Sequence, residues 1–263
     1  MQSLTLVIPN VTFTFHERTF DFNFKLADSK VLYMANIDSS AIGQFILYMV
    51  ALIFSLSVHE SAHAWMSNHF GDDLARLQGR ITLNPVAHVD PIGTLLFPAL
   101  SYFTGAPLFG WAKPTPVNPL RWRNKRVANF WVSAAGVICN FIIAIVAGII
   151  IRVLLFAGLI TLGAGSSLFA PKTDSLILEG AVQLLTTFFI LNVVLGVFNL
   201  IPIPPLDGSK VLQSILPPSF ESGFEALERF GFILLIVAMF TGVFRMIFSV
   251  VMPIALRILL IGA

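Results

Sequence analysis

Apolar residues form five long runs in this chain, at about residues 41–69, 91–109, 127–161, 180–203 and 227–261. A helix that crosses a bilayer needs about 20 such residues. The last run is about 35 residues long, which is enough for two helices with a break near Thr241-Gly242. The run at 91–109 contains Pro98 and Gly105 and is only marginally long enough. The pattern predicts an all-α polytopic membrane protein with about five to six transmembrane helices.

The first 40 residues follow a different period. Residues 13–15 and 20–24 alternate phenylalanine with polar residues, on either side of the turn-like His16-Glu17-Arg18. Strict alternation is typical of a β-hairpin with one apolar face. We therefore expect an N-terminal β-hairpin region at residues 1–40 and a membrane domain at residues 41–263, which carries further β-hairpin elements between its helices.

Composition excludes several classes of protein. The chain is 56% hydrophobic and only 11% charged, whereas a soluble domain carries about 25% charged residues. It cannot cover itself with a water-facing surface, so its surroundings are predicted to be a lipid bilayer. The single cysteine, Cys139, excludes an intrachain disulfide and a cysteine-rich metal site. Nucleic acid is not an expected partner, because no basic stripe with interleaved aromatic residues is present.

Ionisable residues within the first apolar run carry the candidate chemistry. The run contains His59-Glu60-Ser61-Ala62-His63. Two histidines at positions i and i+4 share one helical face, so both imidazoles can reach a single metal ion. The neighbouring glutamate can act as a general base toward a water molecule that the metal activates. Ionisable groups inside a spanning helix are costly and mark functional sites.

A third metal ligand is needed, since catalytic zinc usually has three protein ligands and one open position. Most other carboxylates fall in polar stretches. Asp207 differs, because it follows the prolines of Asn199-Leu-Ile-Pro-Ile-Pro-Pro-Leu-Asp-Gly208 at the end of an apolar run. Prolines break a helix, and irregular backbone at membrane depth is tolerated only beside protein or a water-filled cavity. We therefore predict Asp207 as the third ligand.

The two motifs together resemble the site-2 protease family of intramembrane zinc metallopeptidases. The intermediate segments Gly79–Pro85, His88–Gly93 and Gly110–Asn118 are similar to its short bacterial branch, without PDZ or CBS modules. The resemblance covers about Ile53 to Lys210. It implies that residues 41–263 form an intramembrane metallopeptidase domain that cleaves transmembrane proteins or signal peptides.

The resemblance also assigns residue roles. It makes His59, His63 and Asp207 the ligands of Zn²⁺ and Glu60 the catalytic base. A third family segment usually reads Ala-Gly-Pro-x-x-Asn, whereas this chain has Ala135-Gly-Val-Ile-Cys-Asn140. Its asparagine, Asn140, is our candidate for a contact to the substrate backbone or to the oxyanion. The Gly110–Asn118 segment could offer a strand edge on which an unwound substrate pairs.

Topology follows if the three ligands share one ion. The ends of the first and fourth apolar runs must then lie on the same side, which requires residues 91–109 to be re-entrant or shallow. Charge supports this arrangement, because it places one set of basic residues together on the side that the positive-inside rule makes cytoplasmic. The set is Arg76, Arg80, Lys113, Arg121, Arg123, Lys125, Arg126 and Lys210. We expect a cytoplasmic-membrane protein with its active site toward the cytoplasm.

Two other functions use the same residues. A membrane zinc carrier would use His59, His63 and Asp207 as a transport site and would need no Glu60. A catalytically inactive relative would only bind substrates, but the intact Glu60 argues against it. The CAAX-processing zinc peptidases also carry HExxH but draw a late glutamate as a ligand, which the Asp207 motif disfavours. The sequence indicates neither the substrate nor the oligomeric state.

Overall fold

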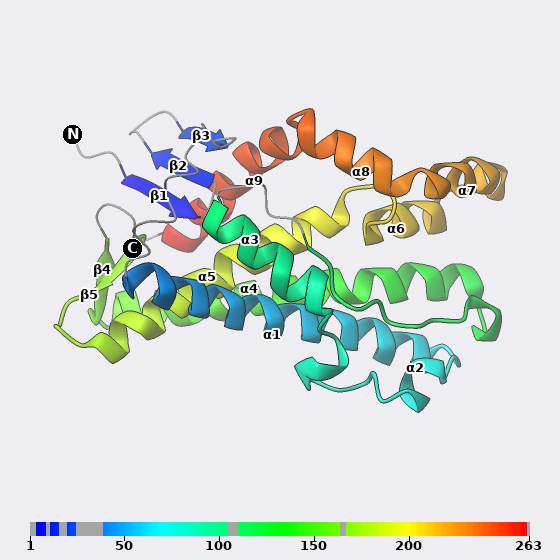
Figure 1. Ribbon diagram of the computed structural model, residues 1–263, viewed down its shortest axis with the longest axis horizontal. Coiled ribbons are helices and arrows are strands. Elements are labelled where there is room, and N and C mark those ends of the chain that lie inside the picture. The colour runs from blue at the N-terminus through cyan, green and yellow to red at the C-terminus, as the bar shows by residue number, and fades with distance from the viewer. Residues whose placement is uncertain are drawn as a thin grey trace.

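Three long helices pack side by side along most of the molecule (Figure 1). They are α1 (Ser39–His69), α4 (Lys125–Phe156) and α5 (Leu176–Leu200). The computed structural model describes residues 4–8, 11–15, 20–24, 39–104, 110–163 and 167–261. Within these residues the protein is mostly helical, as the apolar runs predicted.

Small residues let these helices approach closely. Along α4 the buried positions include Ala135, Gly136, Ala144, Ala147 and Gly148. Without a hydrophobic force between helices in lipid, close backbone approach and buried hydrogen bonds hold them together. The largest apolar cluster joins α4, α5 and the C-terminal helix α9 (Val243–Leu260), and includes fully buried side chains of Ile151, Val182 and Met252.

Four of the described helices are long and apolar enough to cross a membrane, namely α1, α4, α5 and α9. The described part of the run at 91–109 forms a six-residue π-helical turn, η3 (Pro91–Leu96), followed by α3 (Phe97–Thr104), and each of these two is too short to cross. The last run forms α8 (Gly231–Phe240) before α9. The exact number of crossings, predicted as five to six, stays a prediction.

The helix ends follow local signals. Asn124 caps α4 by accepting a hydrogen bond from the backbone N–H of Val127, and Ser175 caps α5 in the same way. The predicted break at Thr241-Gly242 is confirmed, because Gly242 separates α8 from α9 with a φ of +80°. That left-handed conformation costs a glycine little and interrupts the helix.

Two small antiparallel sheets accompany the helices. The N-terminal sheet has the order β1 (Leu4–Ile8), β2 (Val11–Phe15) and β3 (Phe20–Phe24), and Phe15 pairs with Phe20. The β2–β3 pair is the predicted hairpin, and β1 is a third strand that we did not predict. The predicted turn at residues 16–18 lies outside the described residues. A second pair, β4 (Ile160–Leu162) with β5 (Phe169–Pro171), follows α4.

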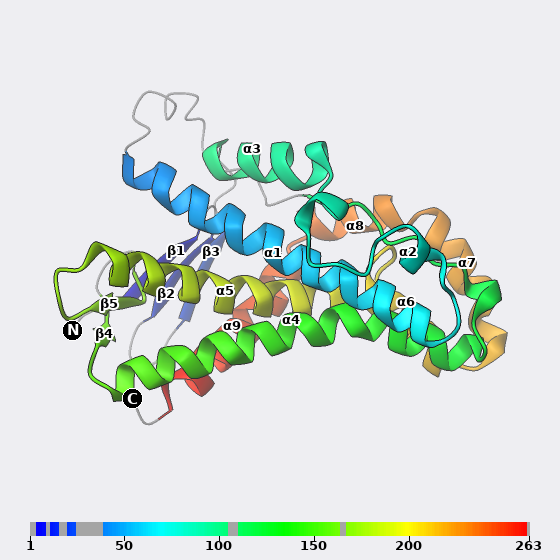
Figure 2. The same ribbon diagram turned by 90° about the horizontal axis from the view of Figure 1, so that it is seen from below.

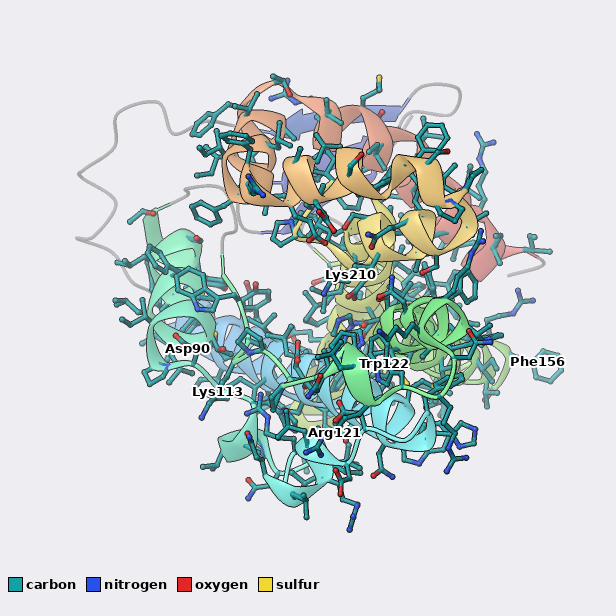
Figure 3. The ribbon with its side chains drawn as sticks, turned by 90° about the vertical axis from the view of Figure 1, so that its right-hand side faces the viewer. Asp90, Lys113, Arg121, Trp122, Phe156 and Lys210 are labelled. Carbon is teal, nitrogen blue, oxygen red and sulfur yellow. The ribbon has the colours of Figure 1, made fainter. Side chains whose placement is uncertain are left out.

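Short helices gather at one end of the bundle, away from both sheets (Figure 2). They are α2 (Leu74–Leu77), α6 (Asp207–Ile215) and α7 (Glu221–Arg229). Neighbouring segments are joined by three-residue 3-10 turns. These are Pro85–Ala87, Pro119–Arg121 and Pro218–Phe220. Figure 3 looks onto this end. Several residues of the predicted basic set belong to its elements: Arg76 lies in α2 and Lys210 in α6.

Candidate metal centre and catalytic site

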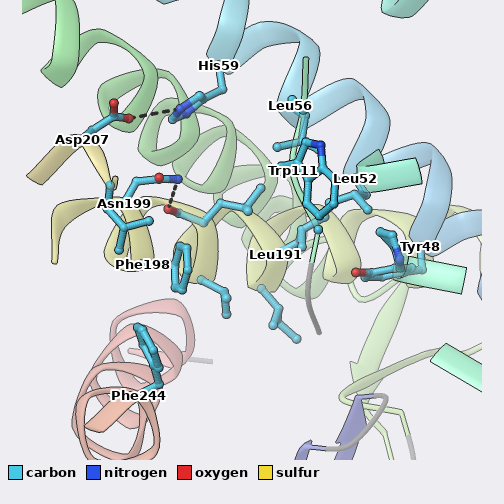
Figure 4. Close-up of a pocket in the computed structure, with 18 of the residues that line it drawn as sticks. Tyr48, Leu52, Leu56, His59, Trp111, Leu191, Phe198, Asn199, Asp207 and Phe244 are labelled. Atoms are coloured by element: carbon cyan, nitrogen blue, oxygen red, sulfur yellow. Dashed lines mark hydrogen bonds and ion pairs between the residues drawn. The ribbon is translucent and has the colours of Figure 1, made fainter. Parts of the chain in front are cut away.

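The three predicted metal ligands meet at one point. His59 and His63 project from successive turns of α1, and Asp207 is the first residue of α6. The Nε2 atoms of the two histidines are 3.0 Å apart. The Oδ2 atom of Asp207 lies 3.2 Å from Nε2 of His59 and 3.3 Å from Nε2 of His63. Figure 4 shows His59 and Asp207 facing each other across this triangle.

The triangle is close in size to the ligand set of a zinc ion. Nitrogen and oxygen ligands lie about 2.0–2.2 Å from a tetrahedral zinc ion, which places neighbouring ligand atoms roughly 3.3–3.6 Å apart. The three observed distances, 3.0, 3.2 and 3.3 Å, are at or just below this range. All three ligand atoms lie within 4.8 Å of one another. Nitrogen and carboxylate ligands in this number suit a catalytic zinc centre, which leaves one position open for water or substrate.

A chain of hydrogen bonds sets the tautomer of His59. The Nδ2 group of Asn192 donates to the carbonyl oxygen of Phe188, at 2.9 Å, and a carbonyl can only accept. Oδ1 of Asn192 therefore accepts from Nδ2 of Asn140, at 3.0 Å. Oδ1 of Asn140 then faces Nδ1 of His59 at 2.6 Å, so that Nδ1 carries the proton. Its Nε2 atom keeps a lone pair for a metal.

His63 is oriented in the same sense by the backbone of α4. Its Nδ1 atom lies 2.6 Å from the carbonyl oxygen of Val132, so Nδ1 donates and Nε2 faces the metal position. Gly136, one turn further along α4, leaves room for both rings. A Cβ atom at this position would lie 2.5 Å from Cε1 of His59 and 2.6 Å from Nε2 of His63. The absence of a side chain at Gly136 is thus a condition for this geometry.

The side chain of Asn140 is buried between His59 and Asn192. Its side chain is 1% exposed, and both of its polar atoms are engaged, with His59 and with Asn192. A contact with a substrate carbonyl or an oxyanion needs a donor that is open to the cavity. In the structure both polar groups of Asn140 have partners inside the protein. Its role as a contact to the substrate backbone or to the oxyanion stays a prediction.

Glu60 is held by a residue that the sequence did not single out. The backbone N–H of Thr115 donates to Oε2 of Glu60, at 2.9 Å. The Thr115 hydroxyl lies 2.9 Å from the same oxygen and 2.9 Å from the Glu60 carbonyl oxygen. Thr115 belongs to the 110–118 segment, which carries no helix or sheet pairing along its length up to Asn118. These contacts fix one carboxylate oxygen of Glu60 and leave the other for chemistry.

The 110–118 segment is itself anchored by Arg80. The guanidinium group donates to the carbonyl oxygens of Lys113, at 2.5 Å, and Pro114, at 2.7 Å, and also to that of Ala87. Arg80 is 4% exposed. Burial lowers the pKa of this guanidinium, and the charge of Glu60 opposes that shift. A buried cation thus fixes the two residues that precede Thr115.

Asp207 reaches the histidines because α5 ends and α6 begins with a sharp change of direction. Gly208 permits this turn, since a Cβ atom there would lie 2.2 Å from the carbonyl oxygen of Leu200. At the other end of α6, the Arg126 guanidinium donates to the carbonyl oxygens of Ser214, Ile215 and Leu216.

The site opens into a large cavity of about 830 Å³. Its walls come from α1, α3, α5, α8, α9 and the 110–118 segment. Most lining side chains are apolar, for example Leu56, Leu191, Phe198 and Phe244, which Figure 4 labels. His59, Glu60, His63 and Asp207 all lie on its surface. Its volume lies within the range of ligand-binding cavities in proteins.

Comparison with known proteins agrees with this geometry. The sequence profile of Peptidase family M50, the site-2 protease family, matches residues 47–238. The chain is 38% identical over 194 residues to "Putative zinc metalloprotease YwhC" of Bacillus subtilis, covering 73% of this chain and 80% of that protein. It is 28% identical over 202 residues to "Putative zinc metalloprotease Rip2" of Mycolicibacterium smegmatis, covering 77% and 70%. No solved structure matches the chain. The chain belongs to peptidase family M50, and it is a zinc metallopeptidase of the membrane.

Proposed function

We propose that this member of peptidase family M50 hydrolyses peptide bonds within or near the transmembrane segments of membrane-anchored proteins or of signal peptides. One observation carries the proposal. The triangle of His59, His63 and Asp207 lies beside Glu60 on the wall of an apolar cavity that helices of membrane-spanning length enclose. A peptide bond can therefore meet a metal site and a base in surroundings that suit an apolar substrate.

Each residue has a proposed part in the reaction. His59 and His63 would hold zinc through Nε2, and Asp207 would hold it through Oδ2. Zinc in such a site supplies Lewis acidity, which activates a water molecule and polarises the peptide carbonyl. Glu60 removes a proton from the attacking water and returns it to the leaving amine. Thr115 holds one oxygen of Glu60, so the other oxygen is the one that accepts the proton.

The arrangement of the helices supports the proposed topology. His59 and His63 lie in the second half of α1, which leads toward α2, and Asp207 is the first residue of α6 (Figure 1). If the end of the bundle that carries α2 and α6 is cytoplasmic, as the positive-inside rule suggests, the site lies on the cytoplasmic side of the cell membrane. The pair η3–α3 then enters the membrane and returns as a re-entrant segment, because its 14 residues, 91–104, are too few to cross.

A substrate helix must unwind before cleavage, because its peptide bonds are hydrogen-bonded and covered. The extended 110–118 segment is a candidate surface for the unwound chain. Among the described residues, the backbone N–H groups of Ala112 and Val117 have no partner, and both residues line the cavity. Val117→Pro should reduce cleavage with zinc retained, whereas Val117→Ala should not. Equal cleavage by the two variants would contradict backbone pairing at this position.

The contacts of Glu60 favour a peptidase over a zinc carrier. A carrier needs no base, and its transport site would gain nothing from the two Thr115 groups that fix the Glu60 carboxylate. A general base, in contrast, must be held within reach of the proton that it removes. Neither a zinc carrier nor an inactive relative would need the contacts between Thr115 and the Glu60 carboxylate.

The test compares cleavage and zinc content in purified protein. Single-span substrates are incubated with wild type, Glu60→Gln and the control Glu179→Gln, whose residue is exposed on α5. Loss of the base should slow cleavage by about 100-fold or more. Zinc content should be equal in all three proteins. If zinc-loaded wild type cleaves nothing but moves zinc into vesicles, the carrier reading replaces the peptidase.

A further inference from the structure

Two neighbouring residues of α4, Val132 and Ser133, border the cavity, and no other described residue of this helix does. The carbonyl oxygen of Val132 is the partner of His63 Nδ1, at 2.6 Å. The bond lengths of a trans peptide place a carbonyl oxygen about 2.8 Å from the next Cα atom, so the Cα atom of Ser133 lies within about 5.4 Å of His63 Nδ1. This part of α4 therefore forms the cavity wall beside the candidate metal ligands.

The side chain of Ser133 lies on the face of α4 that meets the site. Gly136 follows Ser133 by three positions, and residues at this spacing share one helical face. A Cβ atom at Gly136 would lie 2.6 Å from Nε2 of His63. Asn129, four positions before Ser133, donates to a backbone carbonyl of α6, at 3.3 Å. Ser133 thus lies between the histidine rings and α6, the helix that begins with Asp207.

The hydroxyl of Ser133 is free to donate into the cavity. The residue is 3% exposed, and its Oγ atom has no hydrogen-bond partner among the described residues. Three described side-chain atoms are both unpartnered and closed to solvent, namely the hydroxyl oxygen of Tyr48, Nε of Arg80 and Nδ1 of His88. Oγ of Ser133 is not one of them, so part of its surface stays accessible where the residue borders the cavity.

Other helical hydroxyls of the described residues are used inside the protein. Those of Ser57, Thr186 and Ser214 each donate to the backbone carbonyl four residues earlier, at 2.7 Å. This is the usual bond of a serine or threonine within a helix. The hydroxyl of Thr115, which also borders the cavity, is engaged with Glu60. Ser133 therefore differs in having a donor to offer to a molecule in the cavity.

We propose that the Ser133 hydroxyl donates a hydrogen bond to the carbonyl oxygen of the cleaved peptide bond, where negative charge develops as water attacks. The inference rests on the proposed function and adds a catalytic residue to it. Donors fixed beside developing charge stabilise the transition state more than the substrate. Ser133 can make this bond without breaking an internal one, whereas both polar groups of Asn140 already have partners. The hydroxyl keeps its proton throughout, so Glu60 remains the base.

The first test compares Ser133→Ala with the matched control Ser57→Ala. Both substitutions remove the hydroxyl of a buried helical serine, but Ser57 does not border the cavity and is bonded to the carbonyl oxygen of Ile53. For Ser133→Ala we expect kcat to fall about 10- to 100-fold, because a hydrogen bond to a charged group is lost in the transition state. KM, zinc content and melting temperature should not change. Ser57→Ala should keep the wild-type kcat.

The second test measures binding instead of turnover. Two inhibitors share the sequence of a cleaved substrate. One carries a phosphinate at the cleaved bond, which mimics the charged tetrahedral state, and the other carries a methylene group in place of the carbonyl. Ser133→Ala should bind the phosphinate about 10- to 100-fold more weakly than wild type, and the methylene compound equally well. Equal losses for both inhibitors, or a wild-type kcat in Ser133→Ala, would overturn this inference alone. Failure of zinc-loaded wild type to cleave any substrate would instead refute the proposed function and this inference together.

Discussion

The Nδ1 atom of His59 lies 2.6 Å from the Oδ1 atom of Asn140, although 81 positions separate the two residues. This hydrogen bond joins α1 to α4 and continues through Asn192 to the backbone of α5. One buried polar chain thus connects the three central helices and orients His59, a candidate metal ligand. Such partners of metal-bound histidines typically affect affinity by 10- to 100-fold.

Substitution of Asn140 should change zinc affinity according to the acceptor that remains. Asn140→Leu removes the acceptor for the His59 Nδ1–H group, and we expect zinc affinity to fall by about 10- to 100-fold. Asn140→Asp keeps an acceptor and should retain more affinity. Competition with a chelator of known affinity measures both. If the two variants lose affinity equally, Asn140 acts on packing and not on the histidine.

A methyl group at Gly136 should exclude the metal. The added Cβ atom would lie 2.5–2.6 Å from atoms of His59 and His63, far closer than such atoms approach in proteins. Gly136→Ala should therefore lose zinc and cleavage. Gly180→Ala, in α5, is the matched control, because no atom lies within 4 Å of its added Cβ. That variant should keep zinc and gain about 0.5–1 kcal/mol of helix stability. Full zinc content in Gly136→Ala would contradict the site geometry.

Removal of the Thr115 hydroxyl should slow catalysis without loss of zinc. Thr115→Val keeps the backbone N–H that donates to Glu60 but loses the side-chain donor. We expect kcat to fall about 10-fold with KM unchanged, because one net hydrogen bond to a charged group is worth about 1.5 kcal/mol. Thr115→Ser keeps the hydroxyl and should restore most of the rate. A rise in KM alone would assign Thr115 to substrate binding instead.

Loss of the Arg126 side chain should loosen α6 and, with it, Asp207. The guanidinium donates to three carbonyl oxygens at the C-terminal end of that helix, at 2.6, 2.7 and 2.9 Å. Arg126→Met leaves these groups without a protein donor, so we expect a melting temperature lower by several degrees and weaker zinc binding. The neighbouring Lys125→Met is the control, and its thermal unfolding should match wild type. Equal melting temperatures for Arg126→Met and Lys125→Met would show that Arg126 does not stabilise α6.

The fold was predictable where the signal was local. Apolar runs predicted α1, α4 and α5, and the Thr241-Gly242 break was confirmed between α8 and α9. The strand β1 was missed, because its residues 4–8 show no clear alternation. Arg126, one member of the basic set in the sequence, also donates to the last carbonyl groups of α6. The carbonyls that it binds are about 90 positions away, so no local pattern could indicate them.

The sequence by itself determined the chemistry of the protein. The spacing of His59 and His63 on one helix is a local feature, and so are the prolines before Asp207. Both indicate zinc ligands without reference to the rest of the fold. Only the tertiary structure decided how these groups are held, because their partners come from distant segments. Thr115 reaches Glu60 from the 110–118 segment, and Asn140 turns toward His59 from α4. Hydrogen bonds between such segments depend on the packing of the whole bundle, which has no signature in the spacing of residues along the chain.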